Sequence, residues 1–173
     1  MKKALLQYTG GFVFLATLLP GIQIPLAAEL EKTAVENQES NQKILVEIFL
    51  SQEHKKDIDL IKNEFKRFSI TKVRPQFFKL GNPPENIAIG KNIPVSVGQS
   101  AIKLALTYNQ GIKFIIAEKR VAPDYLAIGT SMLDETFQFP ISPDDLKKLS
   151  DTSLTTSQFH ELYRHLTGDD RLP

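Results

Sequence analysis

The chain has no cysteine, and this absence excludes several kinds of structure and chemistry. There can be no disulfide framework, no lipid-attachment cysteine and no catalytic thiolate. Histidine is scarce as well, with three in 173 residues. A structural zinc site is hard to build from so few ligands. We therefore expect neither a metal ion nor a cofactor.

A strong excess of charge is also missing. The chain holds 21 Lys and Arg residues against 20 Asp and Glu residues, with a formal net charge of +1. A nucleic-acid-binding face needs clustered basic residues in excess. The mixed, nearly balanced charge therefore predicts that nucleic acid is not a partner.

Long apolar runs are confined to the N-terminus, where residues 1–28 have the three parts of a secretory signal peptide. Lys2 and Lys3 form a basic head, and the apolar stretch 12–19 is shorter than the about 20 residues of a membrane span. Small residues at the end predict cleavage after Ala28. We expect bacterial-type export to the periplasm or the exterior. The alternative is an uncleaved anchor over 10–28, which is the only membrane contact that we expect.

The rest of the chain divides into a linker and one domain. Residues 29–43 are polar and nearly free of large apolar side chains, so they predict a flexible linker. Residues 44–173 are long enough to bury a core without disulfides and predict a single domain.

Within that domain, strand-like and helical patterns alternate. The run 44–50 is almost entirely apolar, as in a central strand, whereas 58–68 carries apolar residues at helical spacing. Pro75 cannot donate to a strand ladder, so it favours either an edge position or a bulge in the strand expected over 70–80. Asn92 predicts the cap of a second helix. The other expected elements are strands at 87–89, 112–117 and 125–128 and C-terminal helices beginning after Ser142 and Thr155.

This order predicts an α+β fold, an α/β sandwich with helices on one face of the sheet. Strand, helix, strand, strand, helix, strand is the order of a ferredoxin-like, or split βαβ, arrangement. That topology is one candidate, with an extra strand and the two C-terminal helices added to it.

Two short motifs suggest catalysis but fail on geometry. Ser100 and Lys103 have Ser-x-x-Lys spacing, yet Ser100 falls inside a predicted helix, where no backbone amides are available to hold an oxyanion. His160 and His165 are five residues apart, which turns them away from a shared helix face. We assign no catalytic and no metal-binding residues.

The segment 129–139 is the best candidate for a binding surface, because it leaves the last strand with small hydroxyl residues and then presents two acids between apolar side chains. An alternative is that its apolar residues pack under the C-terminal helices and the acids are simply solvated. The candidate binding residues are Arg120, Asp124, Thr130, Ser131, Asp134 and Glu135.

These observations predict an exported cell-envelope module that binds or assembles with an envelope protein or a cell-wall component and is not an enzyme. One alternative is a small periplasmic hydrolase whose site is assembled from separate segments, such as His160 with Asp134 or Glu135. Another is a membrane-anchored envelope subunit that keeps its N-terminal segment.

Overall fold

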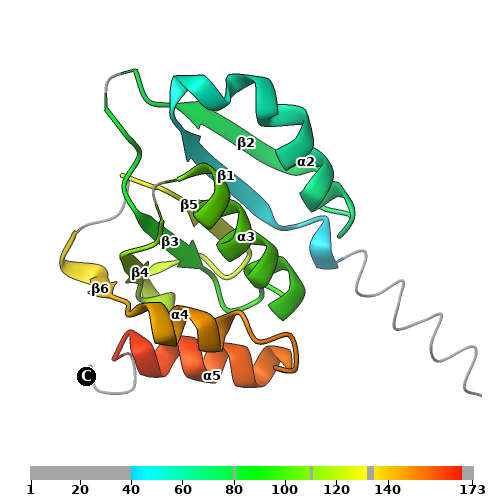
Figure 1. Cartoon of the computed structure of the whole chain (residues 1–173). Coiled ribbons are helices and arrows are strands. Elements are labelled where there is room, and N and C mark those ends of the chain that lie inside the picture. Colours follow the sequence, from blue (N-terminus) through cyan, green and yellow to red (C-terminus); the bar gives the residue numbers. More distant parts are fainter. Residues whose placement is uncertain (1–39, 80, 110, 132–134, 169–173) are drawn as a thin grey trace, which may run out of the picture.

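The computed structural model describes residues 40–79, 81–109, 111–131 and 135–168, and these form one six-stranded mixed sheet with packed helices (Figure 1). The strand order is β2-β1-β5-β3-β4-β6. The α+β class is therefore confirmed. In chain order the elements are β1 (Leu45–Leu50), η1 (Gln52–Asp57), α2 (Ile58–Lys66), β2 (Lys72–Phe77), β3 (Asn86–Ile89), α3 (Val95–Tyr108), β4 (Phe114–Ile116), η2 (Glu118–Arg120), β5 (Tyr125–Ile128), η3 (Glu135–Phe137), β6 (Gln138–Pro140), α4 (Pro143–Leu149) and α5 (Thr156–Leu166).

The sheet contains two ordinary βαβ units rather than split ones. β1 and β2 are parallel direct neighbours joined through α2, and β3 and β4 are parallel direct neighbours joined through α3. β5 lies between the two units, parallel to β1 and antiparallel to β3. In a split βαβ unit another strand would separate the two parallel strands. Element order did not distinguish these topologies, because it does not say which strands become hydrogen-bonded neighbours.

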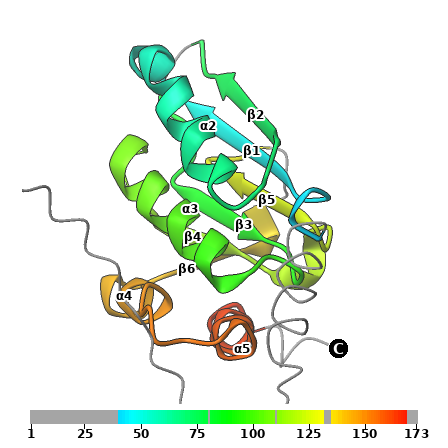
Figure 2. The same ribbon diagram turned by 90° about the vertical axis from the view of Figure 1, so that its right-hand side faces the viewer.

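Alternation along β1 sorts its side chains between the two faces of the sheet. Val46, Ile48 and Leu50 belong to the main core, together with residues of α2 and α3. Glu47 and Phe49 alternate with them and so point to the opposite face. Figure 2 shows α2 and α3 side by side on one face of the sheet.

The two edges of the sheet carry its prolines. Pro75 lies in the edge strand β2, as its missing N–H predicted. At the other edge, Pro140 ends β6, which pairs antiparallel with β4. The sequence did not predict β6, because a three-residue strand is too short to show alternation.

The predicted helix starts were mostly correct. Thr155 and Gln158 form a capping box at α5, and the Ser142 hydroxyl accepts from the Asp145 N–H at α4. Asn92 does not cap α3. Pro94 holds the N-cap position there, and the Asn92 amide donates to Asp124 instead (2.9 Å).

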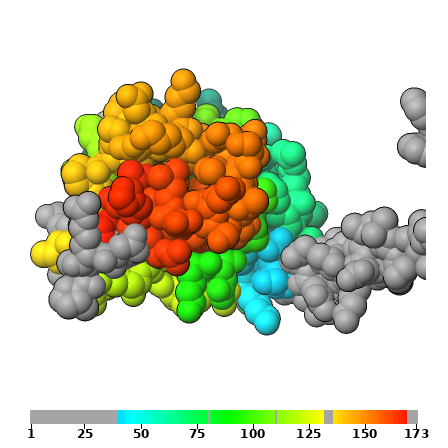
Figure 3. All heavy atoms as spheres, turned by 90° about the horizontal axis from the view of Figure 1, so that it is seen from below, coloured from blue at the N-terminus to red at the C-terminus, as the bar shows by residue number. Residues whose placement is uncertain are grey.

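The helices α4 and α5 pack beside α3 at the β4–β6 side of the sheet, and they form the surface seen from below in Figure 3. Phe159 and Tyr163 of α5 are fully buried in the same core as the strands. The Tyr163 hydroxyl donates to the carbonyls of Ile87 and Ile116. The C-terminal helices are therefore part of the core.

Candidate functional site

The predicted binding residues lie at opposite ends of the sheet. Arg120 follows β4, whereas Thr130 and Ser131 follow β5, which is antiparallel to the β3–β4 pair. The 129–139 segment returns toward Arg120 at its far end, where the guanidinium carbon lies 4.1 Å from the centre of the Phe137 ring. The structure thus joins Arg120 to the segment through a cation–π contact.

Several of these residues already have partners within the fold. Thr130 is fully buried, and its carbonyl accepts a hydrogen bond from Asn86 (2.9 Å). Asp124 accepts from Asn92 across the turn that follows β3. Ser131 is exposed. Asp134, like Met132 and Leu133, lies outside the described residues, and of Glu135 only its position at the start of η3 is described.

His160 forms a buried pair with Glu118, 42 residues earlier in the chain. The side chains are each 7% exposed, with Nδ1 of His160 2.5 Å from Oε1 of Glu118. The other ring nitrogen, Nε2, lies 2.7 Å from the carbonyl oxygen of Ile93. A carbonyl only accepts, so Nε2 carries a proton.

This geometry fixes the number of protons that His160 and Glu118 share. With Nε2 protonated, either the imidazole is doubly protonated beside a carboxylate, or a neutral imidazole accepts from a carboxylic acid. The pair is neutral overall in both cases. The hydrolase hypothesis requires a histidine nitrogen that can take a proton from the substrate. Both ring nitrogens of His160 are already hydrogen-bonded within the fold, so neither is free for this role.

A second buried carboxylate, that of Glu47, lies on the face of the sheet opposite to α2 and α3. Glu47 accepts a hydrogen bond from the Tyr125 hydroxyl (2.8 Å), and the nearest Arg74 nitrogen is 3.9 Å from its second oxygen. Burial, followed by the hydrogen bond and negative charge of Glu47, raises the pKa of the Tyr125 phenol above its ordinary value. Tyr125 therefore remains a protonated donor to Glu47 at neutral pH.

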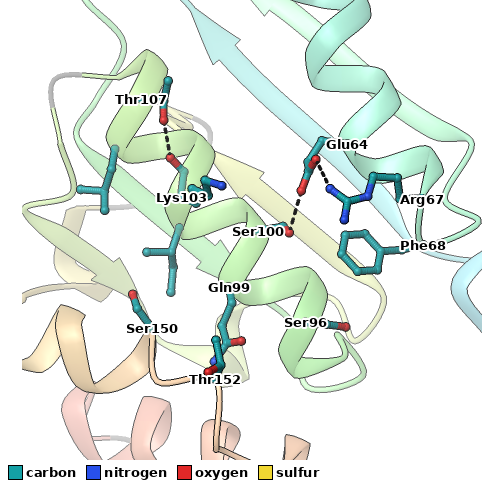
Figure 4. Close-up of a pocket in the computed structure, with 12 residues that line it drawn as sticks. Glu64, Arg67, Phe68, Ser96, Gln99, Ser100, Lys103, Thr107, Ser150 and Thr152 are labelled. Atoms are coloured by element: carbon teal, nitrogen blue, oxygen red, sulfur yellow. Dashed lines mark hydrogen bonds and ion pairs between the residues drawn. The ribbon is translucent and has the colours of Figure 1, made fainter.

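A groove of about 600 Å³ runs between α2 and α3 and is closed at one side by the α4–α5 connection (Figure 4). Most of its lining side chains are polar, and few of them are charged. The lining residues are Glu64, Arg67, Phe68, Ser96, Gln99, Ser100, Ile102, Lys103, Leu106, Thr107, Ser150 and Thr152.

The middle of the groove is a hydrogen-bonded cluster that links the two helices. Ser100 of α3 donates to Oε1 of Glu64 (3.1 Å), and Arg67 donates to Oε2 of the same carboxylate (2.9 Å), as the dashed lines in Figure 4 show. The α4–α5 connection forms the third wall of the groove. Gln99 holds it against α3 by donating to the carbonyls of Leu149 and Asp151. The Ser100–Glu64 hydrogen bond therefore links α3 to α2 within the groove, and Gln99 links α3 to the α4–α5 connection.

The rims of the groove include apolar side chains. Leu106 is 51% exposed on α3, and Phe68 lines the wall at the end of α2. Leu60 is 64% exposed and lies one turn before Glu64, on the same side of α2. Leu106 therefore gives the groove an apolar edge beside its polar side chains.

Ser100 is not arranged as a nucleophile, although the Ser-x-x-Lys pair lines the groove. It is the sixth residue of the 14-residue helix α3, so the backbone amides around it are used in the helix. Its hydroxyl donates to Glu64, whose other carboxylate oxygen accepts from Arg67. The geometry supports binding in the groove better than acyl transfer.

The sequence did not reveal the groove residues Glu64 and Arg67 or the buried Glu118. Their spacing offered one signal, since Glu64 and Arg67 are three apart on a helix and form an ion pair there. Nothing in the spacing connects Glu64 to Ser100 or Glu118 to His160, because those contacts join separate elements.

Among the residues that the structure describes, no group of three or more His, Cys, Asp or Glu side chains is placed to hold a metal ion. No helix in the described ranges is both long and apolar enough to cross a bilayer.

In comparisons with known proteins, no family model, curated protein or solved structure matches this chain.

Proposed function

We propose that this chain is an exported binding module of the cell envelope and that the α2–α3 groove holds its partner. The observation that carries this proposal is the groove itself, in which Ser100 of α3 is hydrogen-bonded to Glu64 of α2 and whose edge exposes Leu106. This hydrogen bond links the two helices that form the groove, and walls held in place before binding lower its entropic cost. Leu106 supplies apolar surface that a partner would bury.

The occupant that fits this groove best is an extended segment of another envelope protein. Backbone amides and carbonyls of such a segment match the hydroxyls and the Glu64 and Lys103 charges, and its side chains match the apolar rims. A glycan would use the hydroxyls but would leave Leu60 and Leu106 uncovered. A cell-wall glycan is therefore an outcome of the test below.

Export is supported by the sequence of residues 1–28, with its basic head, short apolar stretch and small-residue end. N-terminal sequencing of the protein purified from its host tests this part directly. A mature protein that begins at Glu29 is the expected result. Met1 retained in a membrane fraction would favour the anchored subunit, and Met1 retained in the cytosol would contradict export.

Site-specific photo-crosslinking in the host tests the groove. A photoreactive residue at Ser96 or Thr107 lies in the groove, whereas one at Lys72 on β2 or Lys147 on α4 lies outside it. We expect one defined crosslinked envelope protein from the two groove positions and none from the two control positions. Leu106→Asp should lower the yield from Ser96 by about tenfold, because it places a charge on the apolar rim.

Equal crosslinking from all four positions, or none from the groove, would contradict the proposed surface. Sedimentation of the purified protein with isolated cell-wall polymer, weakened by Ser100→Ala but retained by Leu106→Asp, would identify a glycan as the occupant instead. Circular dichroism of the Leu106→Asp variant checks its fold. That fold should be unchanged because the side chain is half exposed.

A further inference from the structure

One end of the sheet gathers exposed lysines from separate segments of the chain. Leu45 begins β1 and pairs with Lys72 at the start of β2 and with Tyr125 at the start of β5. The Gly90 N–H donates to the Tyr125 carbonyl (2.9 Å). This hydrogen bond brings Lys91, which follows β3, to the same end of the sheet.

Two further lysines lie beside the start of β1. Lys43 comes just before this strand, and Lys66 is the last residue of α2. The Asn41 amide donates to the Phe68 carbonyl (3.0 Å), which holds the end of α2 beside the start of β1 (Figure 1). All four lysines are exposed, and together they define the basic end of the sheet: Lys43, Lys66, Lys72 and Lys91.

The positive charge of the basic end is not cancelled within the fold. Among the residues that the structure describes, none of its four lysines has an ion-pair partner. Of the acids nearby, Glu64 is ion-paired within α2, and the buried Glu118 is paired with His160. Asp124 also lies at this end, where its carboxylate accepts from the Asn92 amide. The four lysines therefore give this end a positive potential, although the whole chain is nearly neutral.

The chain also enters the domain at the basic end. Ser40 is the first described residue, and its carbonyl accepts from the Lys43 N–H (3.2 Å). Residues 1–39, with their apolar stretch at 12–19, therefore join the domain here. The signal or anchor predicted within them would hold this end nearest to the membrane, where clustered lysines attract anionic headgroups.

We propose that the basic end docks on the surface of an anionic phospholipid bilayer. Its lysines come from four segments spread across the end of the sheet, so they match a broad layer of negative headgroups better than one small ligand. A lysine ammonium is a compact point charge and does not need the paired geometry of an arginine fork. This contact is additional to the one expected of the N-terminal segment. It does not depend on the α2–α3 groove or on cleavage after Ala28.

Co-sedimentation of the protein purified from its host with lipid vesicles tests the docking. Binding to phosphatidylglycerol vesicles should exceed binding to phosphatidylcholine vesicles, and about 0.5 M NaCl should remove the difference by screening. Lys66→Glu/Lys72→Glu should weaken binding to the anionic vesicles by at least about tenfold. Lys55→Glu/Lys56→Glu makes the same change of net charge at exposed positions of η1 and should weaken it by no more than about twofold.

The readout is the difference between the two kinds of vesicle, because a retained N-terminal segment would insert into both. Equal binding to both kinds, or an equal loss in the two double variants, would overturn the proposal. Circular dichroism checks that the variants are folded. Lys43→Gln/Lys91→Gln, at the other two positions, is a second test and should weaken binding to the anionic vesicles by at least about fivefold.

A fluorescent label tests which end of the sheet meets the bilayer. The chain has no cysteine, so one can be introduced for labelling at a single position. A fluorophore at Thr71→Cys, next to the start of β2, should be quenched by a quencher attached to the lipid headgroups of phosphatidylglycerol vesicles. A fluorophore at Lys79→Cys, beyond the other end of β2, should not be quenched. Equal quenching at both positions, or the reverse order, would contradict docking through the basic end.

Discussion

At the scale of single residues, the most consequential contact is the one between His160 and Glu118. Its two partners come from η2 and α5, and both are buried among apolar side chains. Removing one member of a buried pair leaves the other without compensation, which costs much more than the pair contributes. The contact therefore determines how η2 is positioned against α5.

We predict that Glu118→Ala lowers the free energy of unfolding by about 3 kcal/mol or more. Glu118→Gln should cost clearly less, because its amide can donate to Nδ1 of a neutral His160 while Nε2 keeps its bond to Ile93. Urea unfolding midpoints measure the difference. Glu161→Ala, at an exposed position of α5 next to His160, is the control and should change stability by no more than about 0.5 kcal/mol. Equal midpoints for Glu118→Ala and Glu161→Ala would contradict the assigned pair.

At the scale of secondary-structure elements, the packing of α5 against α3 depends on a glycine. Gly98 is buried in α3, and an added Cβ would lie 2.8 Å from Cζ of the Phe159 ring. Phe159 is itself fully buried, so the ring has little room to move away. A helix-weakening residue is thus present inside α3 because it allows the close approach of α5.

Gly98→Ala should therefore destabilise the protein by about 1–3 kcal/mol through overpacking. In an open helix the same change would stabilise by about 1 kcal/mol, because alanine is the better helix former. Ser96→Ala, at an exposed position of α3, serves as the control and should have little effect. Adding Phe159→Leu should recover part of the loss in a double-mutant cycle. A stabilised Gly98→Ala variant would show that α5 does not pack against this position as described.

At the scale of the whole molecule, one core joins the sheet to α2, α3, α4 and α5. It runs from Ile44 before β1 to Tyr163 in α5, and α4 contributes Leu146 and Leu149. Small proteins have net stabilities of about 5–15 kcal/mol, and each large buried apolar side chain contributes about 1.5–3 kcal/mol. The domain therefore cannot lose its C-terminal helices and keep a stable fold.

We predict that a chain ending at Ile141 has no cooperative unfolding transition. The truncation removes Leu146, Leu149, Phe159 and Tyr163 from the core, together with the Tyr163 hydrogen bonds to two strand carbonyls. Urea unfolding followed by circular dichroism and by tyrosine fluorescence measures this. The full chain should give coincident single transitions with both probes. A sharp transition of the truncated chain at the original midpoint would show that the helices are an independent addition.

Local features of the structure followed from the sequence where neighbouring residues decide them. Pro75 indicated an edge strand, and Thr155 with Gln158 indicated the start of α5. Asn92 failed as a cap because its amide finds Asp124, 32 residues later, and a local pattern carries no sign of that contact. For the same reason the groove was not predicted. Ser100 was visible as a motif residue, whereas its hydrogen-bond partner Glu64 was not.

By itself the sequence determined the α+β class, the positions of most elements and the residues that face the core, because hydrophobic periodicity and capping act over a few residues. Only the tertiary structure decided that β5 lies between the two βαβ units, that His160 meets Glu118 and that the α2–α3 groove exists. Each of these depends on contacts between distant segments. Such contacts are selected by packing of the whole core, and the spacing of residues along the chain does not encode them.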